Sequence, residues 1–162
     1  MPYALLALVL VILDQVVKYL VLTYIPLGGY VPFLPHIACL TYVQNTGAAF
    51  SMFSQHTWIL ALISLIMSVV LAVALWKNFF THPLGKVSLA LLLAGAVGNL
   101  IDRTLRGFVV DMFQLLFMNF AVFNVADICV VVGGIAAAAY YLLLADKLEH
   151  KEASHGTADA DR

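Results

Sequence analysis

Four long apolar segments divide the chain and predict four membrane-spanning helices. They cover residues 3–24, 58–76, 87–101 and 128–144. A helix needs about 20 apolar residues to cross a bilayer, and the last two segments are shorter than that. They reach this length only if residues 102–106 extend the third segment and residues 124–127 begin the fourth. Both additions place polar groups at membrane depth, on the same side of the bilayer.

Small residues mark the faces on which two of these helices pack. Ala90, Ala94 and Gly98 recur every four residues in the third segment, and Gly133 and Ala137 do so in the fourth. Such spacing lets helix backbones approach closely inside a membrane, where water supplies no driving force between helices. We therefore expect an all-α membrane fold, a bundle of four transmembrane helices.

The first connection, residues 25–57, is too long for a tight turn. Prolines and glycines interrupt its early part, whereas residues 39–43 are rich in strand-forming side chains. Asn45-Thr46-Gly47 is a turn signal, and residues 108–110 form a second extended piece. We expect a small β-sheet and a loop outside the bilayer on the extracytoplasmic side.

Composition agrees with a membrane protein and removes several function classes. The chain is 64% hydrophobic and 10% charged, with a mean hydropathy of +1.00. The net charge of -1 gives no reason to expect a nucleic-acid partner. Cys39 and Cys129 form no metal-binding pattern, and the five histidines are scattered. We predict neither a metal site nor a cofactor.

The basic residues orient the predicted bundle. Placing the second connection and the C-terminal tail inside gives five Lys and Arg on the cytoplasmic side against two, Arg103 and Arg106, outside. The positive-inside rule favours this arrangement, with both termini cytoplasmic. Residues 1–149 then form the membrane domain, and the polar residues 150–162 form a disordered cytoplasmic tail.

Asp111 and Asp127 are the most informative polar residues, because both lie in nearly continuous apolar sequence. A carboxylate in such surroundings is unfavourable and marks a functional site. Asp127 alone, three residues after Asn124, resembles a helix cap. Asp111 follows a Val-Val pair and has no such explanation, so the two together indicate a site.

Other polar pairs fall at helical spacing. Asp14 and Lys18 share a face of the first helix, either to support a site or to anchor the helix. For Asp102 and Arg106 we favour an interfacial salt bridge. Asn99 and Arg103 also share a face, and we expect both to point toward the two aspartates. These last two are therefore candidate site residues.

Two neighbouring carboxyls cannot both ionise easily, so one holds a proton while the other does not. That pair can activate water against a peptide carbonyl and then protonate the leaving amine. The motifs of serine hydrolases and zinc peptidases are missing. A small proton-coupled transporter is the alternative, although the carboxylates cluster on one side and no internal repeat is visible. A purely structural membrane subunit would leave Asp111 unexplained.

Taken together, the motifs resemble those of the lipoprotein signal peptidase (signal peptidase II) family, and the resemblance extends to about Leu144. The matching pieces are Asp14-Gln15-x-x-Lys18, Asn45-Thr46-Gly47-Ala48-Ala49-Phe50-Ser51, Gly95-x-x-Gly98-Asn99-Leu100-Ile101-Asp102-Arg103, Gly107-Phe108-Val109-Val110-Asp111 and Phe123-Asn124-Val125-Ala126-Asp127. The resemblance implies an aspartic endopeptidase of the bacterial inner membrane. Its substrates would be prolipoproteins bearing a diacylglyceryl group, cleaved just before the lipidated cysteine, and globomycin would inhibit it.

The same resemblance implies roles for single residues. Asp111 and Asp127 would be catalytic, with Asp14 and Lys18 supporting the site. The residues expected to line the substrate pocket are Asn45, Gly47, Asn99, Arg103 and Asn124. Asn45 and Arg103 do not titrate near neutral pH, so we expect them to bind substrate without changing the pH profile. We also expect the strand at 39–43 to hold an extended substrate by backbone pairing at the membrane surface. Membrane lipid is expected to surround the helices.

Overall fold

The computed structural model describes residues 2–47 and 57–145, without the side chains of residues 144 and 145. Within these ranges it contains four helices long and apolar enough to cross a membrane, as predicted. They are α1 (Pro2–Tyr24), α2 (Thr57–Trp76), α3 (Pro83–Leu105) and α4 (Val125–Tyr140), the last continued by the π-helical turn η2 (Tyr141–Ala145). Residues 48–51 of one motif and the tail at 150–162 lie outside the described residues.

The third and fourth helices gain their length where the sequence analysis required it. α3 continues through Asp102 to Leu105, and α4 begins at Val125 behind its N-cap, Asn124. α3 also starts earlier than predicted. His82 caps it by accepting a hydrogen bond from the Leu84 N–H, and a proline at the first helical position fits there without strain.

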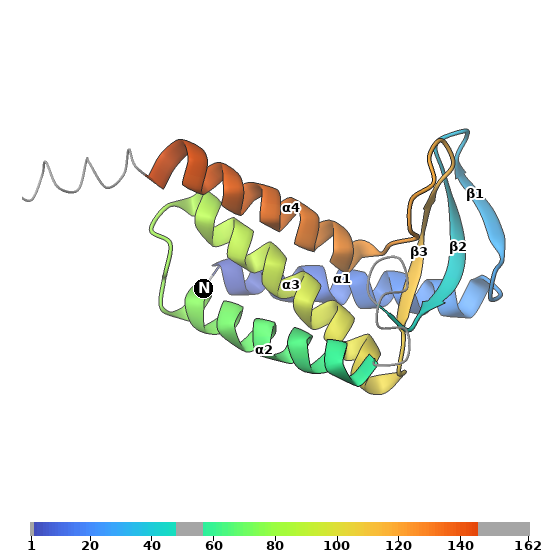
Figure 1. Ribbon diagram of the computed structural model, residues 1–162, viewed down its shortest axis with the longest axis horizontal. Helices are drawn as coiled ribbons and strands as arrows, with labels where there is room; N and C mark the ends of the chain where they lie inside the picture. The colour runs from blue at the N-terminus through green and yellow to red at the C-terminus, as the bar shows by residue number, and fades with distance from the viewer. Residues whose placement is uncertain (1, 48–56, 146–162) are drawn as a thin grey trace, which may run out of the picture.

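α3 is the central helix and packs against each of the other three (Figure 1). Its stripe of small residues, Ala90, Ala94 and Gly98, is buried as expected. On the facing helix, a Cβ added at Gly133 would lie 3.0 Å from side-chain and backbone atoms of α3. The small residues therefore set a close approach between α3 and α4.

A three-stranded antiparallel sheet stands at one end of the bundle (Figure 1). Its strands, in the order β1-β2-β3, are β1 (Tyr30–Leu34), β2 (Ala38–Asn45) and β3 (Val109–Leu115). β2 contains the extended piece predicted at 39–43, and β3 begins at Val109, inside the piece predicted at 108–110. β1 was missed because Pro32 argued against a strand, but β1 is an edge strand, where a missing backbone N–H is tolerated.

The sheet order corrects one functional expectation. β2, which we expected to pair with substrate, is the middle strand and is paired with β1 on one side and β3 on the other. On the second edge of β3, Phe123 forms backbone hydrogen bonds with Phe113, and the Met112 N–H also bonds to the Phe123 carbonyl. The strands nearest the two aspartates therefore offer little free backbone for adding a substrate strand.

A small apolar core fixes the sheet to the end of α1. Val21 of α1 and Ile25, which follows the helix, pack with Tyr42 of β2 and with Val110 and Met112 of β3. The outer faces of the helices, in contrast, expose large apolar side chains, and on α2 only Ser68 and Leu71 are buried. This inside-out distribution suits a bundle surrounded by lipid.

Candidate active site

Asp111 lies on β3 with 1% of its surface exposed. Its two carboxyl oxygens accept hydrogen bonds from the side-chain amides of Asn45, at 2.9 Å, and Asn124, at 2.6 Å. Burial is the main cause that raises the pKa of Asp111 from 3.8 to about 6, and the charge of Asp127 raises it further. The two asparagine donors act in the opposite direction. Asp111 is thus a carboxyl that holds a proton more readily than usual.

Asp127 lies in the first turn of α4 and is partly exposed. It forms a capping box with Asn124: the Asn124 side chain accepts from the Asp127 N–H at 2.9 Å, and the Asp127 carboxylate accepts from the Asn124 N–H at 3.2 Å. Its other oxygen accepts from the Asn99 amide at 2.8 Å. The capping and the site interpretations of Asp127 are therefore compatible, because the cap fixes the carboxylate that faces the site.

Two asparagines connect the carboxyls. The Asn124 amide donates to Asp111 and also to the Asn99 side-chain oxygen, at 3.1 Å, while Asn99 holds Asp127. Asn124, which we expected to line the substrate pocket, is fully buried behind the carboxyls. Its place in the structure is that of a residue that orients Asp111.

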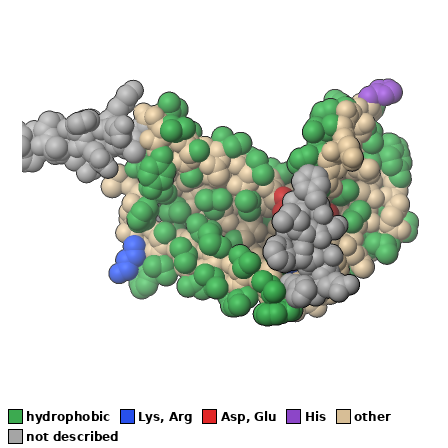
Figure 2. All heavy atoms as spheres, viewed as in Figure 1, with side chains coloured by type: hydrophobic (Ala, Val, Ile, Leu, Met, Phe, Trp, Pro, Cys, Tyr) green, Lys and Arg blue, Asp and Glu red, His purple; other side chains and the backbone are tan. Residues whose placement is uncertain are grey.

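The carboxyls open into a cleft of about 450 Å³. Figure 2 shows acidic side chains in the recess between the helices and the sheet. Five polar residues meet at the cleft, and its remaining walls are apolar. The polar members are Asn45, Asn99, Arg103, Asp111 and Asp127, and the apolar members are Val109, Leu115, Phe120, Ala121, Val122, Phe123, Ile128, Val130, Val131 and Val132.

Arg103 reaches the cleft from the end of α3 and is only weakly held. Its guanidinium makes two long contacts of 3.4 Å, to the Ser64 hydroxyl and to the Gly47 carbonyl, and its buried Nε has no hydrogen-bond partner among residues 2–47 and 57–145. Gly47 in turn donates its N–H to the Asn45 side-chain oxygen at 3.0 Å. This turn, predicted as part of the site, directs the Asn45 amide toward Asp111.

A second polar cluster lies behind the cleft and was only half predicted. Asp14 and Lys18 form a fully buried ion pair at 2.9 Å. Asp102, which we placed in an interfacial salt bridge with Arg106, does pair with Arg106 but is itself fully buried and also pairs with Lys18 at 3.1 Å. The interfacial interpretation of Asp102 is therefore wrong, since α1 covers it.

The described part of the chain contains no group of three His, Cys, Asp or Glu side chains that could hold a metal ion. Cys39 and Cys129 are both buried and unpaired.

The contact with Asp111 changes our expectation for Asn45. An amide that donates to an ionised carboxylate stabilises it, so Asn45→Ala should raise the pKa of Asp111 above about 6. The limb of the kcat/KM pH profile that Asp111 governs should move to higher pH. Gln44→Ala is the matched control, because Gln44 is exposed and bonds to Tyr42. An identical limb in both variants would contradict this role.

The fold and the site together define a class: an integral membrane protein with paired carboxyls in a cleft at one end of four spanning helices. The sequence profile of the signal peptidase (SPase) II family matches residues 6–143. The chain belongs to this family, whose function is to cleave signal peptides from prolipoproteins, and it is a bacterial membrane protein.

Relatives and solved structures agree with this assignment. A lipoprotein signal peptidase of Enterococcus faecalis is 44% identical over 96% of this chain and 95% of its own length. One of Streptococcus pneumoniae is 45% identical, over 80% and 85%. Two solved chains described as bacterial membrane enzymes are each 33% identical. One has a TM-score of 0.81 and covers 90% of this chain and 89% of its own; the other has 0.79, with 89% and 94%.

Proposed function

We propose that this protein is an aspartic endopeptidase that removes the signal peptide from prolipoproteins carrying a diacylglyceryl group, cleaving just before the lipidated cysteine. Asp111 and Asp127 are its catalytic residues. The observation that carries the proposal is that both carboxyls line one cleft and are tied together by Asn124 and Asn99. Family membership supplies the substrate class.

The different surroundings of the two carboxyls suggest different roles. Asp111, buried and with a raised pKa, holds the shared proton. Asp127 is partly exposed, so water reaches it. Ionised Asp127 takes a proton from water as the water oxygen bonds to the scissile carbonyl carbon, and Asp111 donates its hydrogen to the carbonyl oxygen. Asp127 then passes the proton it took to the leaving nitrogen as the C–N bond breaks. Asp111 takes a proton back from one hydroxyl of the gem-diol as the carbonyl reforms, which restores both carboxyls, and no acyl-enzyme forms.

The cleft walls suit a substrate that is part peptide and part lipid. Asn45 and Arg103 line the cleft and offer N–H donors for backbone carbonyls of the scissile segment. The valine-rich wall along α4 offers apolar surface for acyl chains that continue into the bilayer. A globomycin-type cyclic peptide would occupy the same cleft.

The proposal is tested by incubating the purified protein with a lipobox peptide, with and without a diacylglyceryl group on its cysteine. We expect cleavage before the cysteine of the lipidated peptide only, and inhibition by globomycin. Serine- and cysteine-directed reagents and metal chelators should have no effect on the rate. Loss of activity with a chelator, or no cleavage of the lipidated peptide, would overturn the assignment.

We further propose that both termini are cytoplasmic and that the cleft faces the outer side of the membrane. Four spans place both ends of the chain on one side, and five basic residues against two favour the inside for that side. A periplasm-active reporter inserted near Gly28 should be active, and one fused after Arg162 should be silent. The opposite pattern would reverse the topology.

A further inference from the structure

The buried polar cluster behind the cleft contacts the backbone beside each catalytic aspartate. Asp14, on α1, accepts a hydrogen bond from the Ala126 N–H at 2.9 Å. Ala126 directly precedes Asp127 at the start of α4. The carboxylate of Asp14 therefore fixes the point at which α4 presents Asp127.

Asp102, on α3, makes the equivalent contact on the other side of the site. It accepts a hydrogen bond from the Val110 N–H at 3.0 Å. Val110 directly precedes Asp111 on β3. Each catalytic aspartate is thus preceded by a residue whose backbone N–H is held by a buried carboxylate from a different element.

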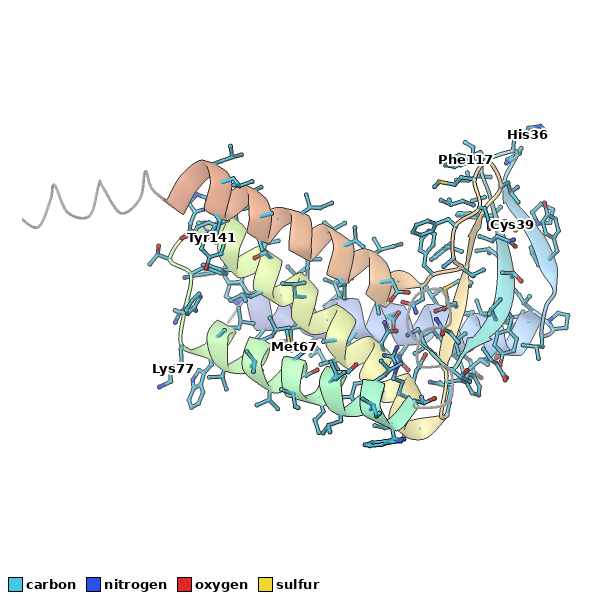
Figure 3. All side chains as sticks on the ribbon, in the orientation of Figure 1. His36, Cys39, Met67, Lys77, Phe117 and Tyr141 are labelled. Atoms are coloured by element: carbon cyan, nitrogen blue, oxygen red, sulfur yellow. The ribbon has the colours of Figure 1, made fainter. Side chains whose placement is uncertain are left out.

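Lys18 joins these two carboxylates. Its ammonium group has 0% exposure and lies 2.9 Å from Asp14 and 3.1 Å from Asp102. Its third contact, at 3.0 Å, is to the Asn99 side-chain oxygen. An ammonium has three N–H donors, so these contacts use all of them. Figure 3 shows nitrogen and oxygen atoms gathered where the helices meet the sheet.

We propose that Lys18, Asp14 and Asp102 form a positioning network that sets the separation of Asp111 and Asp127. The inference rests on the proposed catalytic role of those two aspartates, and it explains why three charged side chains are buried behind them. Lys18 is the centre of the network, because it connects both backbone contacts and also reaches Asp127 through Asn99.

The geometry favours positioning over simple anchoring of α1. Gly98 leaves room for the network, since a Cβ added there would lie 2.6 Å from the Asp14 carboxylate. Gln15 reinforces it by donating to Asp14, to Asp102 and to the Gly98 carbonyl. An anchor would require only the ion pair, whereas here the polar groups converge on the two residues that precede the catalytic pair.

Neither Lys18 nor Asp14 lines the cleft, so the network acts on the reaction from behind it. It does so by positioning the two aspartates, and the charge of Lys18 also lowers the pKa of Asp111. A displacement of about 1 Å between reacting groups lowers a rate by about 10²-fold. We therefore expect damage to the network to lower kcat and to leave KM nearly unchanged.

The test uses two variants of the full-length protein and one control. Lys18→Met leaves Asp14 without its cation and should unfold at a clearly lower temperature. Lys18→Met/Asp14→Asn removes one charge of each sign, so the fold should recover, because Asp102 keeps Arg106. Lys77→Met is the control, since Lys77 lies at the opposite end of the bundle (Figure 3).

We expect the double variant to regain most of the thermal stability lost in Lys18→Met while its kcat stays about 10-fold to 10²-fold below wild type, with KM within about 3-fold. Wild-type kcat in the double variant, or a loss carried by KM alone, would overturn the network. The two proposals fail separately, because wild-type protein that does not cleave the lipidated peptide would refute the peptidase assignment itself.

Discussion

Gly95→Ala is expected to destabilise the protein and lower its activity, whereas Gly134→Ala on the neighbouring helix should do neither. A Cβ at Gly95 would lie 2.5 Å from the Ala126 carbonyl oxygen and 2.5 Å from a methyl group of Val130. The first of these is a backbone atom of α4, so α3 and α4 must separate. Overpacking of this kind costs about 1–3 kcal/mol.

The same separation should disturb catalysis, because Ala126 directly precedes Asp127. A Cβ at Gly134, in contrast, meets no atom within 4 Å. Alanine is also the better helix former by about 1 kcal/mol. Thermal unfolding in detergent and cleavage of a diacylated peptide well below the melting temperature measure both effects. Equal melting temperatures for the two variants would show that the α3–α4 contact is looser than described.

Much of this arrangement follows from the sequence, because its physical signals are local. The length and hydropathy of the apolar runs predicted the helices, and the spacing of Ala90, Ala94 and Gly98 predicted the packed face of α3. Asp111 and Asp127 stood out because an isolated carboxylate in apolar sequence needs a reason. The family motifs then supplied their proposed role.

What the sequence did not predict depends on contacts between distant segments. Asp102 has a local partner in Arg106, four residues along the helix, and this pair alone accounts for its charge in the sequence. Its burial under α1 and its contact with Lys18 therefore could not be predicted. β1 was missed because Pro32 is tolerated only on an edge strand, and the edge position of β1 is a property of the whole sheet. The central place of β2 could not be read from its composition for the same reason.

The largest expected effect comes from Asp111→Asn and Asp127→Asn. Asparagine is nearly isosteric with aspartate but neither takes nor gives the proton, so each change should abolish turnover. Loss of one acid-base partner costs about 10²-fold to 10⁴-fold in rate, and more when two groups act as a unit. Changing Asn45 should be milder, because Asn45 adjusts Asp111 without transferring a proton.

Both variants should still fold. The pKa of Asp111 is about 6 in the folded protein and 3.8 as its ordinary value, so the folded protein binds this proton more tightly than the unfolded chain. The stability that Asp111 contributes is therefore fully present below pH 3.8 and is lost as pH rises through about 6. Asparagine carries no charge and so avoids this loss at neutral pH. Against this, the amide introduced by Asp111→Asn would turn one N–H donor toward the Asn45 or Asn124 amide, a change of about 1 kcal/mol. The two effects oppose each other.

The most direct test of the catalytic pair is therefore the kcat of each purified asparagine variant on a diacylated prolipoprotein, measured together with globomycin affinity to show that the cleft is intact. We predict that kcat falls by at least about 10²-fold in both variants while the inhibitor still binds. Near-normal kcat in either variant would contradict the aspartic mechanism.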